Sequence, residues 1–465
     1  MRLIKIYLSA LASTGVLAAA IEYDSAKGSK PYSPVVASIN DGFITQKNRD
    51  EFESDTSESN TIEIPEICSK DQYVIHSQAD LDVLSDLCHD IMGSIIVSNY
   101  YGPVIDTGDI LTIGGDFVIV NATSLVRVQL SKVAVISGMF KLNELTALTA
   151  VNAPALNTVR VIDWRILPIL STVNFDNGIS EVKSITISDT SLVGFSGFEV
   201  DSLETLNINN NRFMEIINSN LRGINEKLSI SANAKNAVVA LPNLEYANNV
   251  TIRDVGSLSL PSIEGVNASM ELINNNFLSI KFPKLKHIGG TLSLIENFNM
   301  KDVEFPTVED VGGGLMVVNN TMLNKINFLP KLSIVGGAIE FVGDFKEAIF
   351  SKLSLVRGSA QIKSVSDSFD CSRWIRGDDQ NGTTASNSII RGGKIVCTSG
   401  NMQQTVKYDQ DGAVLDEDIS FIDDHESDDA KVGNDTSSGA HSTSVTKALL
   451  GGYIILAGSH SLGLL

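Results

Sequence analysis

Apolar-x-apolar segments recur along the chain at nearly equal intervals of 20 to 24 residues. The two apolar side chains of a segment lie on the same side of a strand, because successive side chains alternate between its two sides. One coil cannot bury them alone, whereas parallel coils stacked about 4.8 Å apart bury a continuous apolar column. The interval therefore predicts an all-β solenoid, either a parallel β-helix or a leucine-rich-repeat-like fold. The segments begin at Ile185, Leu206, Leu228, Val250, Met270, Leu292, Leu315, Ile339 and Ala360.

Polar and turn-forming residues follow the same interval. The sixth position of most segments is asparagine, which we expect to point inward and to hydrogen-bond the backbone of neighbouring coils. A Pro-x-apolar step marks the place where a coil leaves one face, since proline fixes φ and lacks an N–H donor. Gly-Gly pairs permit the tight corner before the next strand. The asparagines are Asn211, Asn233, Asn275, Asn297 and Asn320.

We expect the solenoid to span residues 66–400. The sequence GGDFVIVNAT at 114–123 matches GGGLMVVNNT at 312–321, so the pattern extends upstream of the regular segments. Between residues 155 and 184 the interval is irregular, which indicates either an insertion or a seam. An ordinary β-sandwich with a chance spacing is the alternative, but eight near-equal gaps are hard to produce by accident.

The beginning of the chain has the composition of a processing signal. Residues 1–20 carry Arg2 and Lys5, then an apolar stretch and small residues, which is typical of a secretory signal peptide. A transmembrane anchor is the alternative. Residues 21–65 are polar and acidic, and we expect them to lack a fixed structure.

The C-terminal part predicts an acidic stalk followed by a glycosylphosphatidylinositol (GPI) attachment signal. Residues 401–437 are rich in Asp and Glu, which favours a solvated segment. Residues 438–465 contain a polar spacer and a moderately apolar tail, the pattern of a GPI propeptide. Ser437 is the expected attachment residue. Its alternatives are Asn434, Ser438 and Gly439.

The net charge of −20 argues against a nucleic-acid partner, because phosphate binding requires clustered Lys and Arg. The acidic stalk could hold calcium, but it lacks the Gly and closing Glu of EF-hand spacing. The sequence contains no Gly-x-Ser-x-Gly motif and no phosphate loop. We therefore expect no metal and no cofactor.

Four cysteines form two pairs that are close in the sequence, Cys68 with Cys88 and Cys371 with Cys397. In an exported chain an even number of cysteines predicts disulfides, and this local pairing is preferred among three connectivities. A zinc site is the alternative, although neither pair has CxxC spacing. The pairs flank the repeats, so we expect them to fasten caps that close both ends of the solenoid.

Asn-x-Ser/Thr sequons mark candidate N-glycosylation sites in an exported chain. Asn121 and Asn319 occupy the same position of the repeat, beside the turn, which favours an outward position. A further sequon at Asn434 lies close to the expected GPI site. The predicted glycosylation sites are Asn121, Asn249, Asn267, Asn319 and Asn381.

Parallel β-helices can carry catalytic carboxylates, which must project from adjacent coils on one face. Asp189, Asp254, Glu296 and Asp344 lie at nearby positions of the repeat but not in one register. A polysaccharide-active enzyme is therefore a remote alternative, and no catalytic residue is assigned.

A surface that binds glycans or a protein partner would show aromatic side chains at one position of the repeat. Phe277, Phe298 and Phe328 lie near the turns that follow the asparagines. Phenylalanine in such a place is more commonly a packing residue. A structural surface protein is therefore preferred to a ligand-binding module.

The opening of the predicted solenoid resembles that of receptor L-domains. Residues 68–100 contain a Cys, an Ile-x-Ser-Gln-Ala-Asp-Leu helix start, a second Cys and a Gly-Ser-Ile-x-Val entry into the first strand. Asp80 with Leu81, Leu84 and Leu87 would suit a short amphipathic capping helix. Together with the repeat and the two processing signals, this opening is similar to fungal GPI-anchored cell-wall glycoproteins of the sporulation-specific and extracellular-mutant type.

This resemblance implies a right-handed receptor L-domain-like solenoid with an N-glycosylated surface. It also implies attachment to the outer leaflet of the plasma membrane or to the cell wall, and a role in wall organisation or ascospore-wall formation. The implied partners are the membrane, through the GPI lipid, and cell-wall polysaccharide or wall proteins. The resemblance implies no catalytic residue, and the acidic stalk departs from the Ser/Thr-rich stalk of the family.

Overall fold

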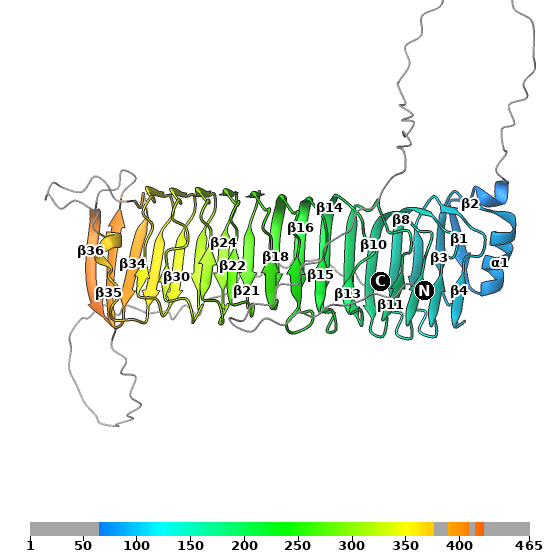
Figure 1. Cartoon of the computed structure of the whole chain (residues 1–465), viewed down its shortest axis with the longest axis horizontal. Helices are drawn as coiled ribbons and strands as arrows, with labels where there is room; N and C mark the ends of the chain where they lie inside the picture. Colours follow the sequence, from blue (N-terminus) through cyan, green and yellow to red (C-terminus); the bar gives the residue numbers. More distant parts are fainter. Residues whose placement is uncertain (1–64, 376–388, 392, 409–413, 423–465) are drawn as a thin grey trace, which may run out of the picture. The chain divides into compact units, whose positions relative to one another are not determined.

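The computed structural model of the chain describes residues 65–375, 389–391, 393–408 and 414–422. Within these ranges the chain forms an all-β parallel solenoid of about 13 turns, as the repeat predicts (Figure 1). Each turn of the solenoid is called a coil here. A coil places a strand on a main face, reverses at a tight turn, places a shorter strand on a second face, and returns.

The main face is a 24-stranded sheet in which equivalent repeat positions of neighbouring coils lie side by side. Ile185 pairs with Leu206, and Leu206 pairs with Leu228, so the apolar columns predicted from the interval are in register. The strands of this sheet that lead up to the turn are β1 (Gln72–Ile75), β3 (Ser94–Val97), β6 (Phe117–Val120), β8 (Val135–Asn143), β10 (Thr158–Leu167), β12 (Ser184–Thr190), β14 (Ser202–Asn209), β16 (Gly223–Ser231), β18 (Tyr246–Arg253), β21 (Met270–Ile273), β24 (Leu292–Ile295), β27 (Leu315–Val318), β30 (Ile339–Gly343), β33 (Ala360–Ser364) and β34 (Lys394–Ser399).

In many coils a two-residue strand precedes the corner that leads into the main strand, and it belongs to the same sheet. Glycines occupy this corner where coils approach most closely. A Cβ on Gly312 would lie 2.2 Å from the carbonyl oxygen of Gly289, so no larger residue fits there. The two-residue strands are β2 (Asp90–Ile91), β5 (Thr112–Ile113), β20 (Gly265–Val266), β23 (His287–Ile288), β26 (Asp310–Val311), β29 (Ile334–Val335) and β32 (Leu355–Val356).

The second face is divided into four separate parallel sheets. Its strands are two or three residues long, so few backbone hydrogen bonds join each pair of coils on this face. The sheets are β4 (Val104–Asp106), β7 (Arg127–Gln129), β9 (Ala150–Asn152) and β11 (Thr172–Asn174); β13 (Gly194–Phe195), β15 (Ile216–Asn218), β17 (Val238–Ala240) and β19 (Ser257–Ser259); β22 (Ser279–Lys281) and β25 (Asp302–Glu304); and β28 (Lys325–Ile326) and β31 (Glu347–Ala348).

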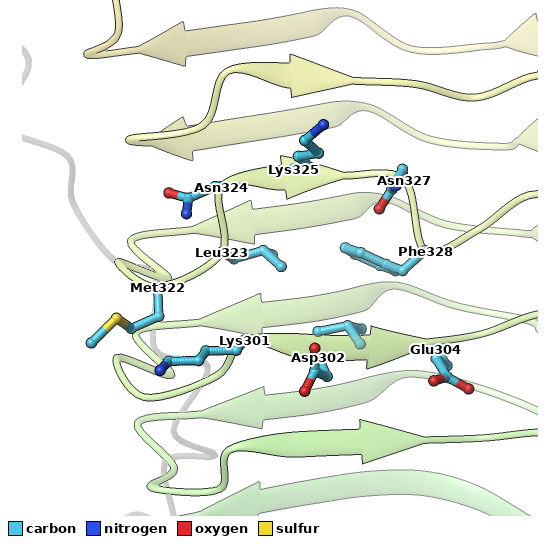
Figure 2. A pocket seen from close by; sticks show the side chains of 10 residues that line it. Lys301, Asp302, Glu304, Met322, Leu323, Asn324, Lys325, Asn327 and Phe328 are labelled. Atoms are coloured by element: carbon cyan, nitrogen blue, oxygen red, sulfur yellow. The ribbon is translucent and has the colours of Figure 1, made fainter.

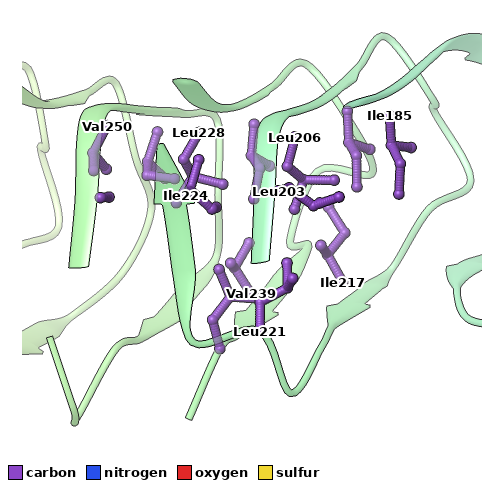
Figure 3. Close-up of a cluster of buried hydrophobic side chains, with 14 of the residues drawn as sticks. Ile185, Leu203, Leu206, Ile217, Leu221, Ile224, Leu228, Val239 and Val250 are labelled. Carbon is purple, nitrogen blue, oxygen red and sulfur yellow. The ribbon is translucent and has the colours of Figure 1, made fainter. Parts of the chain in front are cut away.

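Inward side chains of the two faces meet in one continuous apolar core. Figure 3 shows this packing where Leu206 and Leu228 of the main face lie near Ile217 and Val239 of the second face. All four side chains are fully buried. Aromatic side chains extend the column further along, because the rings of Phe282, Phe305 and Phe328 follow one another at centroid distances of 4.8 and 5.8 Å.

The asparagines at the sixth position form a ladder beneath the turns, as expected. The backbone N–H and the side-chain amide of Asn275 both donate to Asn297 Oδ1 at 3.0 Å. Asn297 donates in the same way to Asn320 Oδ1, at 3.0 and 3.1 Å. Each amide nitrogen also donates to a carbonyl oxygen of the preceding coil, for example Asn297 Nδ2 to Leu272 O at 2.9 Å. These buried side chains are therefore satisfied, which removes the main cost of burying them.

The residue immediately before the ladder position reverses the chain. At this place eleven non-glycine residues have φ between 51° and 59°, the left-handed region that most residues avoid. The sequence pattern does not reveal this position, because its residue types vary from Asn and Asp to Ile and Ala. The eleven residues are Asn99, Asn121, Glu144, Ile166, Asp189, Asn210, Ala232, Asp254, Asn274, Glu296 and Asn319.

The N-terminal end is closed by the short helix η1 (Glu66–Cys68) and by α1 (Gln78–Leu87). Ser77 caps α1 in a capping box with Asp80, whose pKa is lowered because its carboxylate accepts hydrogen bonds from the backbone N–H groups of His76 and Ser77. Leu81 and Leu84 of the expected apolar stripe are buried, whereas Leu87 is exposed.

Disulfides fasten both ends of the solenoid. Cys68 is joined to Cys88 with a Cα–Cα distance of 5.6 Å, and Cys371 to Cys397 with a distance of 5.9 Å. The second bond joins the chain just before α2 (Ser372–Ile375) to β34. Because all four sulfur atoms are oxidised in these bonds, none is a thiolate that could bind zinc.

The structure differs from the expected end of the solenoid at residue 400. Two antiparallel strands, β35 (Met402–Tyr408) and β36 (Val414–Phe421), extend the sheet into the segment expected to be a stalk. Acidic residues favour a solvated segment, but they are also compatible with an exposed strand at the end of a sheet. In β36 such residues are exposed members of a sheet, and Asp416 pairs with Lys407 at 3.1 Å.

The main face continues through the irregular residues 155–184. Strand β10 pairs with β8 on one side and with β12 on the other. The irregularity instead affects the second face, where β11 ends one sheet and β13 begins the next.

Candidate functional site

A charged hollow of about 670 Å³ lies on the second face at the break between β25 and β28. Figure 2 shows Asp302 and Glu304 on β25, Lys325 on β28, and the side chains of Leu323 and Phe328 between the two strands. Strands β25 and β28 are not paired with each other, so the side chains that line the gap between them remain accessible. The charged hollow is lined by Lys301, Asp302, Val303, Glu304, Met322, Leu323, Asn324, Lys325, Asn327 and Phe328.

Ion pairs run along the second face on both sides of the charged hollow. Lys281 Nζ lies 2.7 Å from Glu304, and Lys325 Nζ lies 3.2 Å from Glu347 in the following coil. The Glu304 carboxylate raises the pKa of the Lys281 ammonium above its usual value, by accepting its hydrogen bond and by its charge. Because these groups are exposed, the pairs orient side chains more than they stabilise the fold.

The charged hollow offers hydrogen-bond donors and acceptors on an open surface. The ammonium groups of Lys301 and Lys325 donate, the carboxylates of Asp302 and Glu304 accept, and the amide of Asn327 does both. These groups could bind the hydroxyl groups of a neutral polysaccharide, because each hydroxyl group can both donate and accept a hydrogen bond. Its floor is apolar, since Phe328 and Leu323 are almost fully buried.

The described sequons lie along the edges of the main face. Asn121 and Asn319 follow β6 and β27 directly and are both exposed in the left-handed turn position, in line with the expected outward orientation. Asn249 lies within β18 and Asn267 follows β20, and both are exposed at the opposite end of the main strands. No described sequon lies on a strand of the second face.

Two of the four carboxylates considered for catalysis, Asp189 and Asp254, have structural partners at the turns. Asp189 accepts a hydrogen bond from the side-chain amide of Asn210, and Asp254 accepts one from Asn274 at 2.8 Å. In each case the donor occupies the same left-handed position in the next coil. These acids therefore join neighbouring turns and do not form the facing pair that glycoside hydrolysis requires.

The aromatic residues near the turns differ in exposure. Phe277 and Phe328 are buried, as expected for packing residues, but Phe298 is 45% exposed. Phe298 does not line the charged hollow, but its carbonyl oxygen accepts a hydrogen bond at 3.0 Å from Thr321, the residue before the lining residue Met322, so the turn that carries the exposed ring lies next to the hollow.

Several predicted sites lie outside the described residues. They include the secretory signal at 1–20 and the GPI signal at 438–465. Among the helices that the structure describes, none is long and apolar enough to cross a membrane. The single residues concerned are Asn381, Asn434, Ser437, Ser438 and Gly439.

Comparison with known proteins identifies the family. Sporulation-specific protein 22 of Saccharomyces cerevisiae is 39% identical over 368 residues, which cover 78% of this chain and 78% of the relative. Sporulation-specific protein 2 of the same yeast is 37% identical over 374 residues, 80% of this chain and 73% of the relative. Cell surface GPI-anchored protein ECM33 of Candida albicans is 34% identical over 289 residues, 62% of this chain and 70% of the relative.

The chain belongs to this family of fungal sporulation-specific and cell-wall proteins. No protein-family model matches the sequence. No solved structure matches it either. As a member of the family, the chain is a cell-surface protein that contributes to cell-wall organisation. Two of these relatives are named as sporulation-specific proteins and one as a cell-surface GPI-anchored protein, and none of the three names describes an enzyme.

Proposed function

We propose that this chain is a non-enzymatic, GPI-anchored glycoprotein that supports organisation of the cell wall, including the wall of the ascospore. The observation that carries the proposal is its 39% identity to a sporulation-specific relative over most of both chains. The closed solenoid supports it, because a long core-filled rod with fastened ends suits a load-bearing or spacing element.

Fractionation of the native protein tests the anchor and the glycans. Phosphatidylinositol-specific phospholipase C should release the chain from a membrane fraction, and an N-glycosidase should lower its intact mass. Resistance to the lipase with release by glucanase would indicate covalent transfer to wall glucan. A soluble chain that keeps its C-terminal tail and carries no glycan contradicts the proposal.

A second function, recognition of wall polysaccharide or of a wall protein, is supported by the second face. Glycans on the four described sequons would line the edges of the main face and leave the second face open. The charged hollow on this face supplies polar groups, and the turn next to it carries the exposed ring of Phe298.

Pull-down of the full chain on β-glucan, chitin and mannan tests this second function. We expect Phe298→Ala to weaken retention at least tenfold, because an exposed ring supplies stacking area for a sugar. Phe213→Ala is a matched control, since Phe213 is 47% exposed near the turn of another coil. Equal retention of both variants and the unaltered chain argues against recognition at the charged hollow.

The competing enzyme function predicts a different result on the same polysaccharides. Cleavage that survives glycan removal and disappears on substitution of one carboxylate would overturn the non-enzymatic proposal. We expect no change in polysaccharide chain length after incubation with the full chain.

A further inference from the structure

A hollow of about 290 Å³, here called the turn hollow, opens at the turns that follow β3 and β6. Its lining comes from two neighbouring coils, because β3 and β6 pair in parallel with Val97 opposite Ile119. Continued by two residues, this register places Asn99 beside Asn121. Both have the left-handed backbone of the turn, with φ of 51° and 59°. The turn hollow therefore lies between equivalent turns that are one coil apart.

A sequon and an exposed aromatic ring line the turn hollow together. Asn121 and Thr123, the first and third residues of the sequon, are exposed and belong to the lining. Tyr101 of the preceding coil also lines the hollow and is 80% exposed. Its neighbour Tyr100 is instead buried and donates its hydroxyl group to the carbonyl oxygen of Val104. A glycan attached to Asn121 therefore begins in the same hollow as a tyrosine ring that is largely open to solvent.

The same combination of ring and sequon recurs at the other sequon of the turns. The position equivalent to Asn319 in the preceding coil is Glu296, and both are left-handed. Phe298 lies two residues after Glu296, just as Tyr101 lies two residues after Asn99, and it is 45% exposed. Each of the two turn sequons thus follows, one coil later, a turn with an exposed aromatic side chain.

The remaining turns show that this pairing is selective. Among the eleven left-handed turns with a non-glycine residue, only these two have an aromatic residue two positions later. A single exposed aromatic side chain is ordinary on a protein surface. Here both rings at this place lie one coil before a sequon, and both sequons of the turns have such a ring. The pairing therefore connects the ring with the glycan.

The chemistry of the turn hollow suits the first sugar of an N-glycan. This N-acetylglucosamine is uncharged, and its ring has a face of C–H groups that can pack on the negative face of an aromatic ring. No charged side chain lines the hollow among the residues that the structure describes. The hollow of about 290 Å³ exceeds the volume of about 150 Å³ that holds benzene, so it has room for one sugar ring. Asn99, exposed in the lining, offers an amide that can both donate and accept.

We propose that the N-glycan on Asn121 packs its first N-acetylglucosamine against the ring of Tyr101 in the preceding coil. The contact covers the exposed ring and holds the start of the glycan at the edge of the main face. The inference rests on the proposed glycosylation of the chain and adds the surface that binds the glycan. It is made for Asn121, because Phe298 lies next to the charged hollow, where wall polysaccharide would compete with the Asn319 glycan for the ring.

Site-resolved removal of glycans from the folded, full chain tests this inference. A peptide N-glycosidase cleaves between asparagine and the first sugar, and mass spectrometry of the peptides gives the glycan that remains at each sequon. We expect Tyr101→Ala to speed release at Asn121 about fivefold, because the sugar loses its packing surface. Tyr101→Trp keeps a flat ring and should keep release slow. Release at Asn249, which lies at the opposite end of the main strands, should not change in either variant.

A second comparison separates packing of the glycan from loosening of the turn. In the glycosylated chain Tyr101→Ala should lower the urea midpoint, whereas in the Asn121→Gln background, which lacks this glycan, it should have no effect. An equal decrease in both backgrounds, or unchanged release at Asn121 in Y101A, overturns the inference and leaves the proposed glycosylation intact. A native chain without glycan at Asn121 also overturns it. If Asn249, Asn267 and Asn319 are unmodified as well, the proposed glycosylation fails with it.

Discussion

The main face and the second face of the solenoid are held together in different ways. On the main face a 24-stranded sheet and the asparagine ladder connect successive coils by hydrogen bonds. The second face is divided into four short sheets, and its coils depend more on packed side chains such as Phe282, Phe305 and Phe328.

The difference explains how accessible sites arise on the second face. Paired strands of a sheet lie about 4.8 Å apart, which leaves little space between them. Where strands of the second face do not pair, the side chains below them become reachable. The charged hollow lies at such a break, and so does a smaller hollow between β11 and β13. The main face also has a hollow, where β10 and β14 shift register.

The largest effect is expected from the aromatic column that supports the second face. Phe305→Ala should lower the free energy of unfolding by about 4 kcal/mol, because it leaves a cavity between two rings in a fully buried site. Phe298→Ala, at an exposed ring, should change it by less than about 0.5 kcal/mol. Urea unfolding followed by circular dichroism measures both. Equal changes in unfolding free energy for the two variants would show that packing of the buried rings does not stabilise the second face.

The asparagine ladder should contribute the next largest effect. Asn297→Ala removes the acceptor of two hydrogen bonds and leaves buried donors unsatisfied, so we expect a loss of about 3 kcal/mol. Asn233 makes similar bonds to Asn211 and Ile208 but is half-buried, so water can replace them and Asn233→Ala should cost about 1 kcal/mol. Hydrogen exchange of the adjacent strands locates the loss. A larger loss of unfolding free energy for Asn233→Ala than for Asn297→Ala would contradict the prediction that the buried part of the ladder contributes most.

A smaller effect is expected from completing the ladder at its interruption. Val255 occupies a ladder position, and its N–H already donates to Asn275 Oδ1 at 3.0 Å. Val255→Asn should therefore change the free energy of unfolding by less than about 1 kcal/mol, since partners for the new amide are present on both sides. Val250→Asn, in the apolar column, should destabilise strongly, because no ladder partner exists there. Similar losses of unfolding free energy in the two variants would show that the ladder position does not accept a buried asparagine better than the apolar column does.

The smallest effect is expected from the exposed ion pair of the second face. The raised pKa of Lys281 means that any stabilisation by Glu304 is fully present below the unfolded pKa of lysine and is lost as pH rises through the folded pKa. Lys281→Gln should leave the urea midpoint nearly unchanged at pH 7, and any difference should vanish once the pH exceeds the folded pKa of Lys281. Urea midpoints measured at several pH values check this. If the difference in urea midpoint between Lys281→Gln and the unaltered chain grew with rising pH, the ion pair with Glu304 would not be its cause.

Several features of the main face could be predicted from the sequence because they repeat in one dimension. The interval between segments determines which residues stack, so the register of Ile185, Leu206 and Leu228 follows from counting. The inward asparagines follow because a polar residue in a buried column requires partners of the same kind in the next coil. The helical spacing of α1 predicts the burial of Leu81 and Leu84 separately, although Leu87 of the same expected stripe is exposed.

The breaks of the second face could not be predicted in the same way, because the interval does not change at them: 22 residues separate Thr172 of β11 from Gly194 of β13 across a break, and 22 separate the paired Ala150 and Thr172. The sequence marks residues 155–184 as irregular but does not indicate that the main sheet continues while β11 and β13 separate. It also does not reveal the exposure of Phe298, which depends on neighbours from other coils.

The sequence by itself therefore determined the solenoid, its coil length, its inward polar ladder and the cysteines that close its ends. Periodic burial requires these features, and each can be read from residues within one or two coils. Only the tertiary structure decided the left-handed turn position, the strands β35 and β36 beyond residue 400, and the two hollows of the second face. These depend on the path of the backbone between coils, where side chains that are distant in the sequence meet.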